Sequence, residues 1–305
     1  MNRIGGIVGM MLILALALPA AAQEKKQPKQ PAVPEGVTLQ RDITYATVGD
    51  KALQLDLYMP DLPGQNKPPL VVWIHGGAWR QGSKDRCPIA YLAAEGFAVA
   101  SIQYRLTGEA IFPAQAHDAK AAIRWLRANA ARLGYDASNI AVAGGSAGGH
   151  LAALVGTSGD VKPLEGDVGG NLDQSSRVQA VIDFYGPTDL YYNATQDKDR
   201  VDVADGPLWQ FLGGKPSERL DAAKLASPVH HVSGDDPPLL ILHGTEDPQV
   251  RLLHSQFLHD AYQKAGLPVQ LVVIEGAGHG GPMFNDDARR QIITTFLRRH
   301  LSPRG

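Results

Sequence analysis

From residue 37 onward, short apolar runs alternate with longer amphipathic segments, and this alternation constrains the fold more than any other feature. The run PLVVWI is continuously apolar, as in a strand buried on both faces. The earlier runs ITYATV and LQLDLYMP alternate apolar and polar residues, as in an antiparallel pair with one solvated face. Further strands are expected in FAVASIQYRL, NIAVAGG, VQAVIDFYG, PPLLILHG and VQLVVIEG. This order predicts an α/β fold with a mostly parallel eight-stranded sheet flanked by helices.

The amphipathic segments between these runs predict the flanking helices. The strongest pattern is FPAQAHDAKAAIRWLRANAARLG, in which Ile123 and Leu126 share one apolar face and Gly134 can end the helix. Lys120 and Arg124 are expected to lie off that face. Further helices are expected over PIAYLAAEG, AGGHLAALVG, RLLHSQFLHDAYQKAG and DDARRQIITTFLRRHL.

One connection between expected strands is unusually long. It covers about residues 186–236, is rich in proline and glycine, and exceeds an ordinary connection between elements. We therefore expect a small cap inserted over one end of the sheet. Its aromatic residues either line an aryl-accepting pocket or pack the insertion down, the commoner role; they are Tyr191, Tyr192, Trp209 and Phe211.

The N-terminus differs in composition from the rest of the chain. Residues 1–22 begin with one basic residue, continue with a short apolar run and end in small residues, which is typical of a secretory signal peptide. A membrane anchor is the alternative, but the run is shorter than the ~20 residues that a bilayer requires. Residues 23–36 are predicted to be a flexible linker, and 37–305 a single domain. The mature protein is expected to be secreted or periplasmic, without stable membrane insertion.

Composition excludes several functional classes. The 305-residue chain is 44 % hydrophobic and carries a formal net charge of −2 with both signs interspersed, so it has no electrostatic footprint for nucleic acid. Cys87 is the single cysteine, which rules out an internal disulfide, and its place before Pro88 makes it a poor candidate nucleophile. The histidines lack the spacing of metal ligands, and neither metal nor cofactor is expected. No sequence signal indicates an oligomeric state.

The stretch VAGGSAGGHLAAL places one serine where a buried strand becomes a helix. In the pattern Gly144-x-Ser146-x-Gly148, small residues on either side relieve the crowding of a sharp turn that exposes the hydroxyl. A phosphate-binding P-loop would need a lysine here, and a dinucleotide loop would need a glycine in place of Ser146. A flexible linker would not lie between two apolar elements. We therefore interpret Ser146 as a candidate nucleophile.

A serine needs a base to take its proton, and that base needs an acid to orient it. His279 follows the last expected strand, among glycines. Asp247 follows the strand before it and is favoured as the acid over its neighbour Glu246. The order serine, acid, histidine after successive strand ends matches one known arrangement of a catalytic triad.

Acyl transfer also requires N–H donors for the oxyanion. The N–H of Ala147, directly after the serine, is one candidate donor. The loop HGGAW supplies the others: we expect donors at Gly77 and Ala78, with Gly76 shaping the turn. His75 is expected to hydrogen-bond within this loop, and His150 to support the structure of the site rather than to react.

These residues resemble the α/β-hydrolase superfamily, in particular a bacterial esterase/lipase branch with an HGG-x-W oxyanion motif. The stretches YRL, FYGPTDL and ASPVHHV look like the same branch, and the chain is similar to secreted feruloyl and acetyl-xylan esterases. The resemblance implies Ser146, Asp247 and His279 as the triad. It also implies structural roles for the carboxylates of Asp118 and Asp189.

The sequence departs from the pattern of that branch at two positions. Ala78 replaces the third glycine found in relatives of hormone-sensitive lipase, and Arg251 stands where many members have proline. Neither change removes a group of the expected triad, but both leave the subfamily open.

The predicted function is that of a secreted serine hydrolase acting on carboxylic esters, either short-chain esters or the hydroxycinnamoyl and acetyl esters of plant polysaccharides. Two enzymatic alternatives share the triad order: a peptidase or amidase of the prolyl-oligopeptidase type, and an arylformamidase. A third alternative is a non-catalytic binding protein on the same fold.

Overall fold

The computed structural model describes residues 1–2, 33–62 and 67–301. The predicted signal peptide and most of the linker therefore lie outside the described residues. Within the described ranges, no helix combines the length and apolar character that crossing a bilayer would need.

The sheet has eight strands in the order β1-β2-β4-β3-β5-β6-β7-β8. Pairing is antiparallel between β1 and β2 and between β2 and β4, and parallel across the rest. This confirms the predicted mostly parallel eight-stranded sheet. The strands are β1 (Val37–Val48), β2 (Lys51–Pro60), β3 (Pro69–Ile74), β4 (Ala98–Ile102), β5 (Asp136–Gly145), β6 (Ala180–Phe184), β7 (Leu239–Gly244) and β8 (Val269–Ile274).

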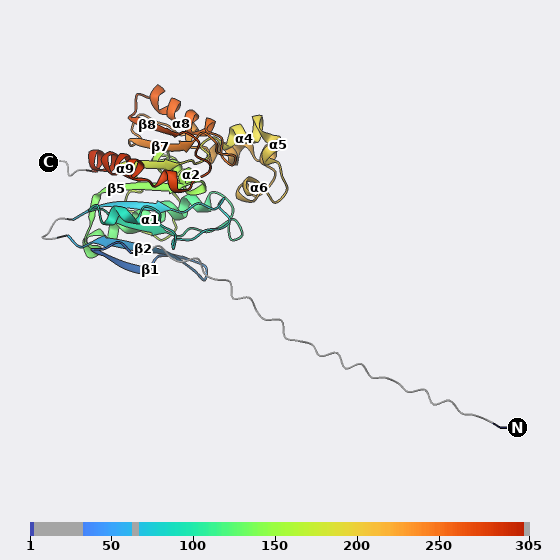
Figure 1. The fold of residues 1–305 in the computed structure, drawn as a ribbon, viewed down its shortest axis with the longest axis horizontal. Coiled ribbons are helices and arrows are strands. Elements are labelled where there is room, and N and C mark those ends of the chain that lie inside the picture. The colour runs from blue at the N-terminus through green and yellow to red at the C-terminus, as the bar shows by residue number, and fades with distance from the viewer. Residues whose placement is uncertain (3–32, 63–66, 302–305) are drawn as a thin grey trace. The chain divides into compact units, whose positions relative to one another are not determined.

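Helices cover both faces of the sheet (Figure 1), and the sheet separates two hydrophobic cores. One core joins the sheet to α1 (Ala114–Leu133), α2 (Ala147–Thr157) and α8 (Leu253–Lys264). The other joins the opposite face to the 3₁₀ turn η1 (Ala90–Ala93) and to α9 (Asp287–His300). α1 ends as expected at Gly134, which takes a left-handed conformation.

A series of short helices connects β6 to β7, in the region expected to be the cap. Figure 1 shows α4, α5 and α6 grouped beyond one end of the sheet. The elements of this cap are α4 (Leu190–Gln196), α5 (Lys198–Val201), α6 (Pro207–Leu212), η2 (Pro216–Glu218), α7 (Leu220–Leu225) and η3 (Pro228–His230). The remaining short elements are α3 (Lys162–Glu165) and η4 (Pro282–Phe284).

The helix predicted over PIAYLAAEG is wrong in extent. Only the four residues of η1 are helical, and they form a 3₁₀ turn. Gly96 adopts a left-handed φ of 92°, and the N–H of Phe97 bonds back to the carbonyl of Leu92 at 3.1 Å. The chain therefore leaves the helix after a single turn and enters β4.

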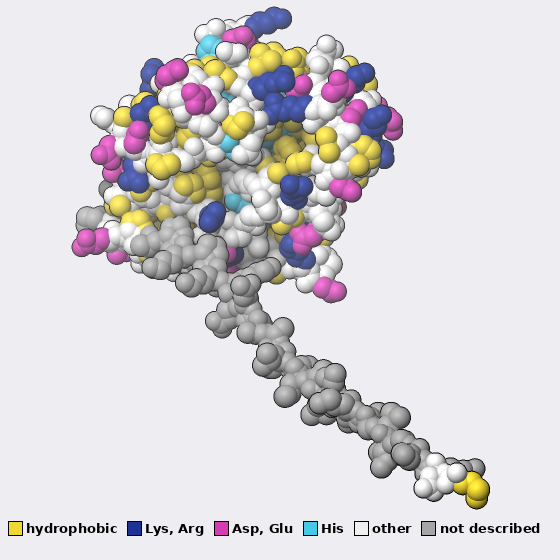
Figure 2. Space-filling model, turned by 45° about the vertical axis from the view of Figure 1, so that its right-hand side comes forward, with side chains coloured by type: hydrophobic (Ala, Val, Ile, Leu, Met, Phe, Trp, Pro, Cys, Tyr) yellow, Lys and Arg dark blue, Asp and Glu magenta, His cyan; other side chains and the backbone are white. Residues whose placement is uncertain are grey.

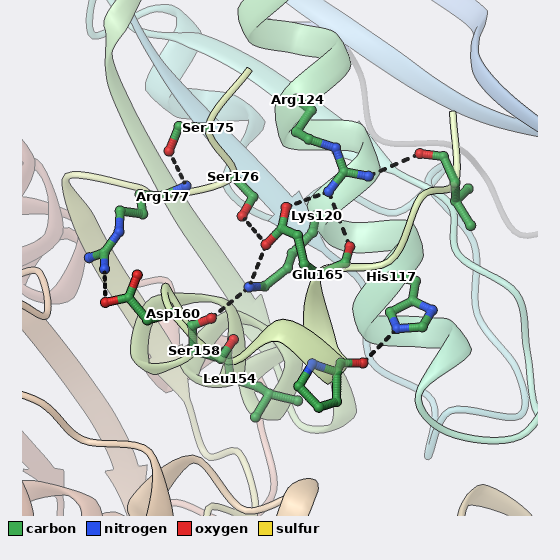
Figure 3. Close-up of polar contacts among 12 residues, drawn as sticks. His117, Lys120, Arg124, Leu154, Ser158, Asp160, Glu165, Ser175, Ser176 and Arg177 are labelled. Atoms are coloured by element: carbon green, nitrogen blue, oxygen red, sulfur yellow. Dashed lines mark hydrogen bonds and ion pairs between the residues drawn. The ribbon is translucent and has the colours of Figure 1, made fainter. Parts of the chain in front are cut away.

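Two cations that the sequence pattern places off the apolar face of α1 are nevertheless buried. Lys120 and Arg124 are both 1 % exposed, because the segment around α3 covers them. Figure 3 shows Glu165 between the two cations. Its carboxylate lies 3.0 Å from Lys120 Nζ and also pairs with Arg124, while Lys120 donates a second bond to the carbonyl of Ser158 at 2.7 Å. A partner about forty residues away along the chain allows these cations to be buried.

We expect Glu165→Gln to destabilise the fold. Burial alone would raise the pKa of this half-buried carboxyl, but Lys120, Ser176 and Arg124 outweigh burial and lower the pKa. Loss of the charge leaves two buried cations uncompensated, so the free energy of unfolding should fall by about 3 kcal/mol. Urea denaturation followed by circular dichroism measures this. Asp167→Asn, at an exposed position two residues on, should change it by less than about 0.5 kcal/mol; equal effects would refute the role of the cluster.

Candidate active site

Ser146 occupies a strained turn between β5 and α2. Its φ of 57° and ψ of −121° are unusual for a residue with a side chain. A Cβ on Gly144 would lie 2.1 Å from the carbonyl oxygen of Gly148, and one on Gly148 would lie 2.0 Å from that of Ile74. The crowding anticipated from the sequence is therefore present, and only glycine fits at either position.

The structure brings the three sequence-predicted triad residues together. His279 Nε2 lies 2.8 Å from Ser146 Oγ, and His279 Nδ1 lies 2.7 Å from Asp247 Oδ2. With the Nδ1 proton on the carboxylate side, Nε2 is free to accept the hydroxyl proton. The three residues follow β5, β7 and β8, whose carboxyl ends lie at one edge of the parallel sheet.

The surroundings of Asp247 keep it ionised. Its side chain is inaccessible to solvent, and its Oδ1 accepts the N–H groups of Gln249 and Val250 at 2.8 and 2.9 Å. Burial by itself raises the pKa of this carboxyl, but hydrogen bonds from His243, His279 and Val250 outweigh burial and hold the pKa well below its usual range. Glu246, the alternative acid, is exposed.

The HGGAW loop lies directly beside the serine. Ala78 and Ala147, two of the candidate oxyanion donors, both line the pocket that contains Ser146 and His279. Gly76 packs so tightly that a Cβ would lie 2.6 Å from the carbonyl oxygen of Gly145. Gly77 accepts the N–H of Gln81 at 3.1 Å and does not line the pocket. The loop geometry favours Ala78 over Gly77 as the donor from this segment.

Two nearby histidines and the cysteine lie away from the reacting groups. His75 hydrogen-bonds through Nδ1 to the carbonyl of Gly76 at 2.8 Å, within its own loop, and stacks on Tyr104. His150 is fully buried and contacts Trp79. Cys87 is also buried, and burial raises its pKa to about 12, so its thiol is not a nucleophile at neutral pH.

A pocket of about 380 Å³ opens above Ser146 beneath the cap. Figure 2, which brings the cap side forward, shows hydrophobic side chains around a hollow on this face. Its apolar wall consists of Trp79, Pro187, Leu190, Val201, Val203, Pro207, Leu208 and Val250. None of the cap aromatics considered from the sequence lines this pocket; Phe211 is buried and stacks on Trp79 with ring centroids 4.3 Å apart. Phe211 therefore has the packing role, and the rings of Tyr191 and Tyr192 contact His230 and Phe257.

Several site residues have no signal in the sequence. Asn193, Arg200 and Gln249 supply polar groups to the pocket, and Arg200 donates to the carbonyls of Pro248 and Gln249 at 2.6 and 2.7 Å. Tyr185 follows β6 with a φ of 47°, and its ring meets that of His279 edge-on at 4.8 Å. Only the fold brings these cap and loop residues to the serine.

The two carboxylates that the resemblance marked as structural do bind neighbouring segments. Asp118, at the start of α1, accepts the N–H of Arg105 at 2.8 Å and an ion pair from its guanidinium at 2.7 Å. Asp189 accepts the N–H of Tyr192 at 2.7 Å and caps α4. Arg251, one of the departures from the branch pattern, pairs with Asp197 of the cap at 3.2 Å. In the described ranges, no group of three or more His, Cys, Asp or Glu side chains is arranged to hold a metal.

Comparison with solved structures finds the same fold in named esterases. A truncated carbohydrate esterase from gut microbiota superposes with a TM-score of 0.81 at 34 % identity, over 89 % of this chain and 99 % of that one. The butyrate-bound esterase Est2 of Thermogutta terrifontis gives a TM-score of 0.72 at 30 % identity, over 89 % of this chain and 97 % of that one.

Curated relatives carry similar names. Esterase LipC of Mycobacterium tuberculosis is 33 % identical over 76 % of this chain and 57 % of its own length. An ethyl acetate hydrolase of Pseudomonas putida is 29 % identical over 85 % of this chain and 82 % of its own. The chain spans little more than half the length of LipC and of two similar mycobacterial relatives.

Family models match most of the folded region. The TAP-like protein model matches residues 220–305. The BD-FAE model matches residues 55–262, which is more than half of the chain. Together with the eight-stranded sheet and its structural neighbours, this match establishes that the chain belongs to the BD-FAE family and is an α/β-hydrolase.

Proposed function

We propose that the protein is a serine hydrolase of carboxylic esters. The observation that carries the proposal is the continuous hydrogen-bonded series from Ser146 through His279 to Asp247, at 2.8 and 2.7 Å. The named esterases among its relatives and structural neighbours support the same reaction class.

In the proposed mechanism, Ser146 Oγ attacks the ester carbonyl while His279 Nε2 takes its proton. The carbonyl oxygen becomes an oxyanion that accepts the N–H groups of Ala78 and Ala147. His279 then gives the proton to the leaving alcohol, which departs and leaves an acyl-enzyme. His279 then takes a proton from water, which attacks the acyl carbon; the Oγ–acyl bond breaks, the carboxylic acid leaves, and His279 returns the proton to Ser146 Oγ. Asp247 fixes the His279 tautomer and stabilises the imidazolium.

The pocket combines an apolar wall suited to an acyl group with polar side chains suited to an alcohol portion. Its wall is largely aliphatic, and Asn193, Arg200 and Gln249 offer hydrogen bonds to hydroxyl groups. The proposed substrates are short-chain esters and the acetyl or hydroxycinnamoyl esters of plant polysaccharides, and the carbohydrate esterases among the structural neighbours support this class. With the signal-like N-terminus, we propose action outside the cytoplasm.

Hydrolysis of model esters tests this proposal. The purified protein is expected to hydrolyse p-nitrophenyl acetate and butyrate, and to release product from methyl ferulate or acetylated xylan. Peptide p-nitroanilides and N-formylkynurenine serve as the amide and formamide comparison. Turnover of these amides with no ester turnover would instead support the peptidase or arylformamidase alternative.

A substitution in the cap tests whether the pocket holds the acyl group. Val203 lines the pocket yet is 55 % exposed, so Val203→Trp should narrow the pocket without disrupting the core. We expect kcat/KM for p-nitrophenyl butyrate to fall about tenfold relative to the acetate, since one or two methylenes are worth about that factor in an apolar pocket. Leu172→Trp, at an exposed position that does not line the pocket, is the control. An unchanged ratio in Val203→Trp would place the acyl group elsewhere.

A further inference from the structure

Two consecutive residues of the HGGAW loop are held in an unfavourable backbone conformation. Ala78 has a φ of 54° and Trp79 a φ of 58°, and neither is glycine. Such a conformation is unfavourable for a residue with a side chain and persists only where its surroundings impose it. Because Ala78 lines the pocket beside Ser146, its N–H direction depends on whatever holds this strained pair.

The side chain of Trp79 contacts two other elements of the protein. Its ring stacks on Phe211 of α6 at 4.3 Å, and its indole Nε1 donates to Nδ1 of His150 at 3.2 Å. Its backbone carbonyl accepts the N–H of Thr107 at 2.9 Å. The stacking contact with Phe211 is apolar and allows the indole ring to slide in its own plane. The hydrogen bond from the indole N–H is therefore the side-chain contact that fixes the orientation of Trp79.

His150 is built to accept that bond. It lies on α2 one turn after Ser146, and its own N–H donates to the Ser146 carbonyl at 2.9 Å. Because Nδ1 accepts from Trp79, the ring proton lies on Nε2, which donates to the carbonyl of Ala226 in the cap at 2.7 Å. The side chain is fully buried and both ring nitrogens have partners. Burial lowers its pKa to about 4, so the ring stays neutral near pH 7 and keeps Nδ1 as an acceptor.

We propose that His150 is a positioning residue for the oxyanion hole: it holds Trp79, and through Trp79 the N–H of Ala78, and it joins this loop to the cap through Ala226. The proposal rests on the proposed ester hydrolysis, whose transition state would use that N–H. One imidazole thus connects the helix that follows the nucleophile, the oxyanion loop and the cap. A purely structural core histidine would affect stability without affecting the chemical step selectively.

Two substitutions at His150 distinguish the roles of its two ring nitrogens. The amide of His150→Asn reaches the place of Nδ1 and can accept from Trp79, but it leaves the Ala226 carbonyl without its donor. The amide of His150→Gln reaches the place of Nε2 and can donate to Ala226, but it leaves the indole N–H without an acceptor. Both variants keep a polar side chain at position 150. The melting temperature of each variant measures the loss of stability that comes from replacing the imidazole.

Steady-state kinetics with p-nitrophenyl acetate test the assignment. We expect kcat of His150→Gln to fall at least about tenfold, with KM changed less than about threefold, because losing an oxyanion donor costs 10²–10³ in kcat and a displaced donor retains part of that. His150→Asn should recover most of the lost kcat even if its melting temperature is no higher. Trp79→Phe keeps the stacking and removes the indole donor, so it should lose as much kcat as His150→Gln, and the double variant should lose no more.

Two results would overturn the positioning role. One is a kcat that follows the melting temperatures of the variants regardless of which nitrogen is replaced. The other is full additivity of Trp79→Phe and His150→Gln. If His150→Gln does not fold, Trp79→Phe tests the proposal by itself: an unchanged kcat in Trp79→Phe would refute the positioning role. Failure of the proposed function is distinct, because the wild-type protein would then hydrolyse no ester at all.

Discussion

Ser146→Ala is expected to lower kcat for p-nitrophenyl acetate by about 10⁴- to 10⁶-fold, leaving only the catalysis that the oxyanion hole and binding provide. The hydroxyl forms its hydrogen bond with His279 at 2.8 Å and does not cap α2, so its removal takes away the attacking atom and no support of the helix. The strained turn of Ser146 is as unfavourable for alanine as for serine, so the fold should persist. Steady-state assays with matched circular dichroism spectra measure both effects.

A second serine on the same strand provides the control for this prediction. Ser138 is exposed at the opposite end of β5, where it hydrogen-bonds to Asp136 at 2.7 Å. Ser138→Ala should leave kcat within about twofold of the wild type, as expected for a surface change. Retention of wild-type kcat by Ser146→Ala would contradict the proposed nucleophile.

Asp247→Asn is expected to lower kcat by about 10⁴-fold, because the amide no longer fixes the His279 tautomer with the proton on Nδ1. The fold should tolerate the change, since asparagine has the same shape and its oxygen can still accept the N–H groups of Gln249 and Val250. The same p-nitrophenyl acetate assay measures the loss, and the pH profile of kcat reports the altered imidazole.

Glu246→Gln is the matched control for that substitution, at the neighbouring carboxylate. Glu246 is exposed, and its backbone N–H donates to the carbonyl of Ala277 at 2.9 Å. Its kcat should stay within about twofold of wild type. Loss of activity in Glu246→Gln with retention in Asp247→Asn would reverse the assignment of the acid.

The sequence was sufficient to predict the sheet and the meeting of Ser146, Asp247 and His279. Each of these residues lies shortly after the end of a parallel strand, and the carboxyl ends of such strands meet at one edge, so local pattern already determines proximity. The choice of Asp247 over Glu246 depended on a turn that buries one carboxylate and exposes the other.

What the sequence could not predict depends on contacts between distant segments. Lys120 and Arg124 lie off the apolar face of α1 in the sequence pattern, yet Glu165 and the carbonyls near it make their burial possible. Likewise, the pocket is lined by Val203 and Arg200 rather than by the cap aromatics, because short helices of the insertion turn Phe211 inward onto Trp79. Periodicity describes one element at a time and carries no information about such partners.

The central claim is that Ser146 is activated as a nucleophile, and covalent labelling tests it most directly. The purified protein is incubated with a fluorophosphonate probe, digested, and analysed by mass spectrometry. One adduct per chain is expected, on Ser146, absent in Ser146→Ala and strongly reduced in His279→Ala. No adduct on the folded wild-type protein, or an adduct of equal yield on another residue in Ser146→Ala, would contradict it.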